Sequence, residues 1–165
     1  IGCDIMNKKA IERIYLIKRR DKNKPFSFIC SGLKNISDYA KVSNYAYKTM
    51  KRLLPGPYTF ILEGSKLVPK IMLTKRKTAG IRVPDHAICM ALVETLGSPI
   101  LTTSATLPDG STLNDPYLIE DNFGKRLDLI IDGGTVPGEP SSVISLISDE
   151  PEVIREGLGK IDFME

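Results

Sequence analysis

Residues 55–62 read Pro-Gly-Pro-Tyr-Thr-Phe-Ile-Leu, a rigid turn followed at once by a run of β-forming residues. The stretch 43–54 before it reads as a helix, which the Pro-Gly-Pro turn stops. Aromatic and β-branched residues then predict a strand over 58–62. A helix that leads into a strand through a short turn is the pattern of an α/β protein.

The N-terminal side shows the same alternation of helix and strand. Asn7 can cap a helix in which apolar residues recur at helical spacing from Ala10 to Ile17. The triplet Lys18-Arg19-Arg20 ends this helix, where cations complement the helix dipole, so a structural explanation of the triplet exists. Residues 26–30 then predict a short strand.

The C-terminal side continues the alternation to the end of the chain. A helix capped by Asp85 is predicted to run through Leu96 and to end at Gly97, and Asp115-Pro116 starts another helix that ends near Gly124. The turn sequence before residue 153 predicts that the last two strands form an antiparallel addition to the sheet. The predicted strands on this side are 80–83, 99–103, 127–131, 142–147 and 153–155.

Composition is that of an ordinary globular chain. The 165 residues fit one domain, 1–165, with 42% hydrophobic and 26% charged residues. Apolar runs stay far below the roughly 20 residues that cross a bilayer, which predicts a soluble protein without a membrane partner. Three cysteines without a Cys-x-x-Cys pair and the single His86 predict no disulfide framework and no metal site, and favour a reducing, cytoplasmic setting.

Charge is divided unevenly along the chain. Residues 1–108 hold 19 Lys and Arg against 7 Asp and Glu, a net +12, whereas 109–165 hold 4 against 13, a net −9. The basic part suits a surface that attracts the phosphates of a nucleotide or of RNA. The alternative is that these side chains only solvate the helices on which they lie.

The common phosphate-binding and hydrolase motifs are absent from the sequence. There is no G-x-x-x-x-G-K-[ST] and no G-x-G-x-x-G, and Gly133-Gly134 with Gly138 reads as a loop. There is also no G-x-S-x-G, and a single histidine disfavours a Ser-His-Asp triad. P-loop, dinucleotide-binding and serine-hydrolase chemistry are therefore disfavoured.

Six short segments occur in an order that resembles the YrdC/YciO family. That family shows K-x-R, P-G-P-x-T-F, R-x-P, S-A-N, P-S-T-V and R-x-G in this order, and the match covers essentially all 165 residues. The corresponding segments here are Lys18-Arg19-Arg20 with Pro25, Pro55-Gly56-Pro57-Tyr58-Thr59-Phe60, Ile81-Arg82-Val83-Pro84-Asp85-His86, Leu101-Thr102-Thr103-Ser104-Ala105-Thr106, Pro140-Ser141-Ser142-Val143 and Ile154-Arg155-Glu156-Gly157.

The resemblance implies an α/β, YrdC-like fold: a twisted mixed sheet of parallel and antiparallel strands with helices and a basic concave face. It implies the activity of a threonylcarbamoyl-AMP synthase, a nucleotidyltransferase that condenses L-threonine, bicarbonate and ATP to threonylcarbamoyl-adenylate and pyrophosphate for tRNA modification. ATP would be a substrate with Mg²⁺ bound to it, and tRNA or double-stranded RNA a further partner. Because negative charge accumulates in this reaction, cations and hydrogen-bond donors are the expected catalysts.

The same resemblance implies the site residues. Lys18, Arg20 and Ser104 would be catalytic, and Arg19 is the weaker member of the basic triplet. Arg82 would pair its planar fork with the threonine carboxylate. Each of these residues also has a structural explanation, such as a satisfied turn or an ion pair. The other substrate- and nucleotide-binding residues would be Thr102, Thr103, Thr106, Ser141, Ser142 and Arg155.

Two departures from the family pattern bear on activity. Thr106 stands where the family has the Asn of S-A-N, so a short branched hydroxyl replaces an amide that both donates and accepts. The family's P-T-D-T-x-Y-G-L segment, which supplies a strand and substrate contacts, is expected just before Ile1. The altered tripeptide is closer to the YciO branch. The alternative function is therefore a YciO-like RNA- or nucleotide-binding protein without efficient synthase activity.

Overall fold

One mixed sheet forms the centre of the molecule. The computed structural model describes residues 1–19, 26–75, 77–136, 138–148 and 150–162. Eight strands lie in the order β1-β6-β2-β5-β4-β7-β8, with β3 paired to β4 beside this path. They are β1 (Gly2–Asp4), β2 (Ser27–Ile29), β3 (Ala40–Lys41), β4 (Tyr58–Gly64), β5 (Thr78–Arg82), β6 (Ile100–Thr102), β7 (Ser142–Ser145) and β8 (Glu152–Arg155).

The strand pairing confirms the mixed α/β fold. Strand β2 runs parallel to β5, and β4 runs parallel to β7. Antiparallel pairs join β4 to β5 and β2 to β6. The β7–β8 pair is antiparallel, as the turn sequence before residue 153 predicts.

Side-chain caps fix where several helices begin. Asn7 accepts a hydrogen bond from the Ala10 backbone N–H, and Asp115 accepts from the N–H groups of Tyr117 and Leu118, so both predicted caps are confirmed. Gly97 ends its helix in the left-handed region at φ 75°. The helices are α1 (Lys8–Lys18), α2 (Leu33–Tyr39), α3 (Asn44–Leu53), α4 (Ala87–Leu96) and α5 (Pro116–Phe123), with 3-10 turns η1 (Lys70–Met72) and η2 (Gly124–Arg126).

One side of the sheet, which we call the core face, carries most of the fully buried apolar residues of the strands. Successive side chains of a strand point to opposite faces, so every second residue joins the same layer. Helices α2 and α3 contribute Ile36, Ala46 and Met50 to the same buried cluster. The core-face residues are Phe28, Tyr58, Phe60, Leu62, Ala79, Ile81, Leu101 and Ile144.

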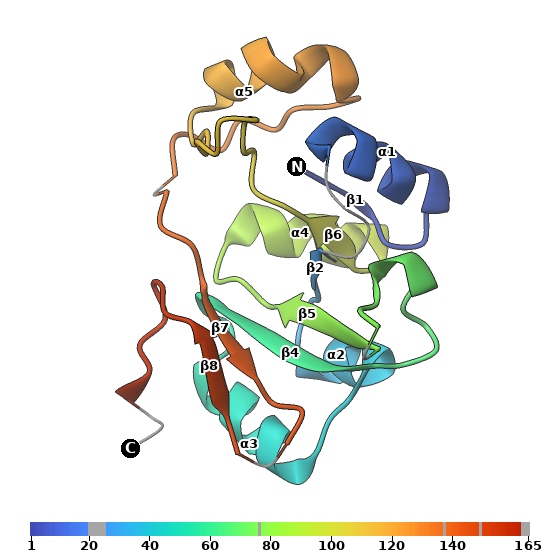
Figure 1. The fold of residues 1–165 in the computed structure, drawn as a ribbon, viewed down its shortest axis with the longest axis vertical. Coiled ribbons are helices and arrows are strands. Elements are labelled where there is room, and N and C mark those ends of the chain that lie inside the picture. The colour runs from blue at the N-terminus through green and yellow to red at the C-terminus, as the bar shows by residue number, and fades with distance from the viewer. Residues whose placement is uncertain (20–25, 76, 137, 149, 163–165) are drawn as a thin grey trace.

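A second and much smaller cluster holds the other end of the molecule together. Ile17, Ala105 and Phe123 are buried in it, and they come from α1, the segment after β6, and α5. Figure 1 shows α1 and α5 at one end of the long axis and β7, β8 and α3 at the other. Residues 103–115 connect the sheet to the α5 end.

Two local predictions are wrong. Residues 127–131 form no strand, and Leu129 and Ile131 are 75% and 47% exposed, because this apolar run finds neither a strand partner nor a covering layer. Helix α4 starts after His86 and not after Asp85, and His86 makes no side-chain cap. Among the described residues, no helix is long and apolar enough to span a bilayer.

Candidate functional site

A cleft of about 890 Å³ opens on the side of the sheet opposite the core face. Its size is within the usual range of ligand sites, about 300–1,000 Å³. Because strand residues alternate between faces, the side chains between the core-face positions form the floor of this cleft. We call these residues the cleft face: Ser27, Thr59, Ile61, Thr78, Gly80, Arg82, Thr102 and Val143.

Two arginines, Arg82 and Arg155, contribute positive charge to the cleft. Burial lowers the pKa of the Arg82 guanidinium, and the charge of Arg155 lowers it further. The Arg82 Nε atom is buried and has no hydrogen-bond partner among the described residues. No ion pair between described residues includes either arginine. A half-buried cation in this state favours an anionic ligand.

The end of β6 places hydroxyl groups beside these cations. Thr102, Thr103, Ser104 and Thr106 all line the cleft, as the family pattern implied. The Thr102 Oγ1 atom is buried and lacks a partner within the described part of the chain. An orphaned buried hydroxyl is uncommon in folded proteins, so this atom is a candidate ligand contact.

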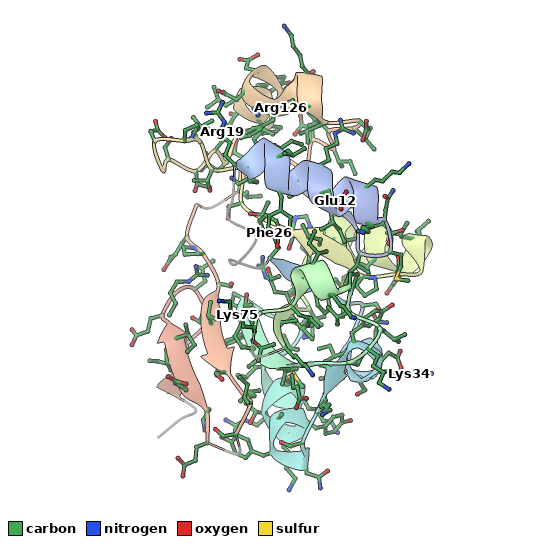
Figure 2. All side chains as sticks on the ribbon, turned by 45° about the vertical axis from the view of Figure 1, so that its right-hand side comes forward. Glu12, Arg19, Phe26, Lys34, Lys75 and Arg126 are labelled. Atoms are coloured by element: carbon green, nitrogen blue, oxygen red, sulfur yellow. The ribbon has the colours of Figure 1, made fainter. Side chains whose placement is uncertain are left out.

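Lys18 and Arg19, the first two residues of the basic triplet, lie at the C-terminus of α1. Lys18 Nζ donates a 2.7 Å hydrogen bond to the backbone oxygen of Thr106, although Lys18 does not line the cleft. Arg19 caps α1 in the left-handed region at φ 46°, and Figure 2 shows it at the end of the helix near Arg126. Arg20 lies outside the described residues, so its predicted role stays a prediction.

Ser141 and Arg155 meet at the opposite side of the cleft. The Arg155 Nη2 group donates to the Ser141 backbone oxygen at 2.7 Å, and Nε donates to the same atom at 3.2 Å. The Ser141 hydroxyl lies 2.8 Å from the Thr59 hydroxyl. These bonds fix both cleft-lining residues relative to the sheet.

Ser142 does not lie in the cleft, which revises its predicted place at the nucleotide. The residue is fully buried, and its hydroxyl donates to the Gly159 backbone oxygen at 2.6 Å. The same hydroxyl accepts from the Gly157 N–H at 3.0 Å. Because Ser142 and Ser141 are neighbours in an extended chain, they point to opposite faces, and only Ser141 reaches the cleft.

The structure adds cleft residues that were not among the predicted site residues, although Thr59 belongs to the P-G-P-x-T-F segment. Thr59 and Thr78 are cleft-face residues, and Asn114 and Thr112 line the cleft from beyond β6. Gly80 adds no side chain to the cleft floor. A Cβ there would lie 3.2 Å from Thr59 Cγ2, which is a tight contact. Alternation within 58–62 and 78–82 could have indicated the strand residues. No sequence pattern predicts that residues 112–114 lie beside Ser104-Ala105-Thr106, which we call the S-A-T segment.

A site for a protein-bound metal is not evident in the described part of the chain. No group of three His, Cys, Asp or Glu there could hold a metal ion. Mg²⁺ that accompanies a nucleotide is usually held by phosphates, water and one or two carboxylates.

Comparison with known proteins agrees with the motif order. A model of the Sua5/YciO/YrdC family, described as "Telomere recombination", matches residues 1–157. The YciO protein of Escherichia coli K12 is 45% identical over 163 residues, which are 98% of this chain and 79% of the relative. The threonylcarbamoyl-AMP synthase of Pyrococcus abyssi is 29% identical over 159 residues, which are 95% of this chain and 47% of the relative.

Solved structures show the same relationship. The crystal structure of E. coli YciO matches with a TM-score of 0.90 and 46% identity, covering 97% of this chain and 79% of that one. Sua5 of P. abyssi, solved in complex with L-threonine, matches with a TM-score of 0.88 and 28% identity, covering 94% of this chain and 46% of that one. The chain therefore belongs to the Sua5/YciO/YrdC family.

Proposed function

We propose that this chain is a threonylcarbamoyl-AMP synthase-like nucleotidyltransferase, which condenses L-threonine, bicarbonate and ATP to threonylcarbamoyl-adenylate and pyrophosphate. One observation carries the proposal. The cleft face holds Arg82 without an ion pair to any described residue, beside Arg155 and a rim of hydroxyl groups. Such a site suits a ligand with a carboxylate and phosphates.

Arg82 is the proposed partner of the threonine carboxylate. Its buried Nε has no partner in the part of the chain that the structure describes, so a carboxylate would offset the cost of holding this cation away from water. A related family member, Sua5 of P. abyssi, was solved with L-threonine bound. Thr102, whose hydroxyl is also unsatisfied among described residues, lies on the same floor and would donate to the same ligand.

The nucleotide is proposed to lie between the β6 end and the Ser141 side of the cleft. Ser104 and Thr103 offer hydroxyls on one side, and Arg155 offers a guanidinium on the other. Lys18 already donates to Thr106 O, so part of its proposed role is to position the loop that carries Thr106. Its ammonium carries three N–H donors, so a phosphate contact by Lys18 is compatible with this bond. Arg20 is the other proposed phosphate contact from this triplet.

The proposed reaction has two steps, and neither requires a protein side chain with a shifted pKa as general base. The threonine amine combines with bicarbonate to give a carbamate and water. A carbamate oxygen then forms a bond to the α-phosphorus while the bond to the bridging oxygen breaks, and pyrophosphate leaves. Negative charge grows on the phosphoryl oxygens, where the cleft cations and hydroxyls would stabilise it. Mg²⁺ bound to the nucleotide would neutralise part of that charge.

Pyrophosphate release by the purified chain tests this proposal. Release should require ATP, L-threonine and bicarbonate together, and omission of any one should abolish it. Serine or glycine in place of threonine should give a lower rate. Release that ignores threonine, or no release by protein that binds ATP, would reject the synthase.

The second candidate function is RNA or nucleotide binding without efficient synthesis. Thr106 in place of the family's Asn is the observation that favours it. The net +12 of residues 1–108 suits a polyanion. This candidate predicts salt-sensitive RNA affinity whose logarithm falls linearly with the logarithm of salt concentration, together with background pyrophosphate release.

A further inference from the structure

The residue that replaces the family's asparagine is held by a neighbouring segment. Thr106 and Thr112 form an antiparallel bridge, and their hydroxyl oxygens lie 3.1 Å apart. Two backbone hydrogen bonds frame the bridge, from Leu107 N to Ser111 O and from Leu113 N to Ala105 O. The Thr106 hydroxyl thus has a partner inside the protein, and the cleft lacks an amide at this position.

The same short ladder brings another amide to the cleft. Asn114 directly follows Leu113, whose N–H is bonded to Ala105 O at 2.9 Å, so its backbone lies beside the S-A-T segment. The Asn114 backbone oxygen accepts from Val136 N at 3.2 Å. The next residue, Asp115, is fixed as the N-cap of α5. The backbone of Asn114 is therefore fixed on both sides.

The side chain of Asn114 is available to a ligand. It is half-buried and lines the cleft together with Ser104 and Thr106. Among the described residues, its amide makes no hydrogen bond. An amide without a protein partner at the wall of a ligand-sized cleft is open to contact with a ligand.

We propose that Asn114 binds the nucleotide, its Nδ2 donating to a phosphoryl oxygen, and so supplies from across the ladder the amide that position 106 lacks. The inference rests on the proposed function, because it takes the cleft ligand to be ATP. It also means that the S-A-T tripeptide does not by itself identify a disabled site. In this proposal, the amide donor lies at Asn114 on one side of the ladder and not at position 106 on the other.

Calorimetric titration with MgATP tests the assignment in a small set of variants. Asn114→Ala should weaken binding about ten- to hundredfold, the usual loss for a hydrogen bond to a charged group. Asn114→Asp should weaken it further, because a carboxylate repels the phosphate. Asn122→Asp is the matched control: Asn122 is exposed on α5, donates to Leu118 O and does not line the cleft, so it should leave affinity unchanged.

Thr106→Asn separates an amide function from a folding defect. In the Asn114→Ala background, it should restore most of the lost affinity, whereas in the wild type it should change little. Asn114→Ala with wild-type affinity, in protein that binds MgATP, overturns the inference and leaves the proposed function intact. Wild-type protein that binds no MgATP overturns both. Equal losses from Asn114→Ala and from Asn122→Asp would also reject the assignment.

Discussion

The two faces of the central sheet are built from alternate residues of the same strands, yet they are stabilised in opposite ways. On the core face, Phe28, Phe60 and Ile81 are fully buried against other apolar groups. On the cleft face, Arg82 and Thr102 hold buried polar atoms that lack partners among the described residues. The core face thus provides stability, and the cleft face keeps polar groups ready for a ligand.

This difference allows stability and binding to be separated residue by residue. Apolar burial contributes about 25 cal/mol per Å² removed from water, so the core face dominates the free energy of unfolding. An unpaired buried cation lowers that free energy, and a bound anion restores it. Neighbours such as Phe60 and Ile61 on β4 should therefore respond very differently to the same substitution.

Phe60→Ala should give the largest effect, on stability. Phe60 is fully buried and stacks beside Tyr58 with ring centroids 5.9 Å apart. Removing a buried phenyl ring costs about 3–5 kcal/mol of unfolding free energy. Ile61→Ala, one residue along on the cleft face, should cost only about 1 kcal/mol, because Ile61 is half-buried. Urea denaturation followed by circular dichroism measures both, and equal costs would contradict the two-face description.

Arg82→Ala should give the next largest effect, on the ligand. Loss of the guanidinium fork should weaken threonine binding by about 1.5–3 kcal/mol, or roughly ten- to hundredfold. Without ligand, the unfolding free energy should stay unchanged or rise, because a desolvated cation beside Arg155 has been removed. Threonine titration and thermal unfolding of the ligand-free protein measure the two quantities.

Arg126→Ala is the structural counterpart of this variant. Arg126 donates to Asn122 O at 2.9 Å, and its guanidinium lies 4.9 Å from the Phe123 ring centroid. Its loss should lower stability and leave threonine affinity unchanged. If both arginine variants weaken threonine binding alike, the cleft has no dedicated cation and the assignment of Arg82 fails.

Local signals in the sequence were sufficient for much of the fold. Asn7, Asp115 and Gly97 mark helix ends through bonds or backbone angles within a few residues, and all three predictions are confirmed. The short helix α2 was not predicted, because its N-cap Gly32 offers no side-chain bond. Residues 127–131 were misread, because whether an apolar run becomes a strand depends on a partner elsewhere in the chain.

Only the site residues that lie within the family motifs could be predicted from the sequence. The motifs brought Arg82, Ser104 and Arg155 to one cleft, although their roles remain predictions. Asn114 could not be found this way, because its position depends on the hydrogen bond between Leu113 and Ala105. Predicting the place of Ser142 requires knowing which residues of β7 face the cleft, since a shift of one residue moves a side chain to the other face of the sheet.

Thr59→Val should give a smaller effect, shared between stability and binding. The change keeps the shape of the side chain but removes the buried 2.8 Å contact with the Ser141 hydroxyl. We expect a loss of about 1 kcal/mol in unfolding free energy and a severalfold weaker MgATP affinity, since Ser141 loses its orientation. Thr59→Ser retains the hydroxyl and should keep the affinity. A Ser variant as weak as the Val variant would mean that methyl packing, and not the hydrogen bond, matters.

The smallest expected effect concerns pH and the core thiol Cys30. Burial, with a further contribution from Asp38, raises the pKa of Cys30 to about 12 from its ordinary 9.0. The unfolded chain therefore loses the thiol proton above pH 9, while the folded chain keeps it until near pH 12, so stability falls as pH rises through this window.

Between pH 8 and 10, the wild type should lose about 1 kcal/mol more unfolding free energy than Cys30→Ala, which lacks the titrating group. Denaturation in the presence of a reductant, repeated at each pH, gives both slopes. Tyr58, which also titrates in this range, is present in both proteins and cancels in the difference. Burial and the Cys30 charge raise the pKa of Tyr39, so any part of its titration that remains in the difference also reports on Cys30. Parallel slopes would show that Cys30 ionises in the folded protein as readily as in the unfolded chain, and that the core face does not exclude a charge there.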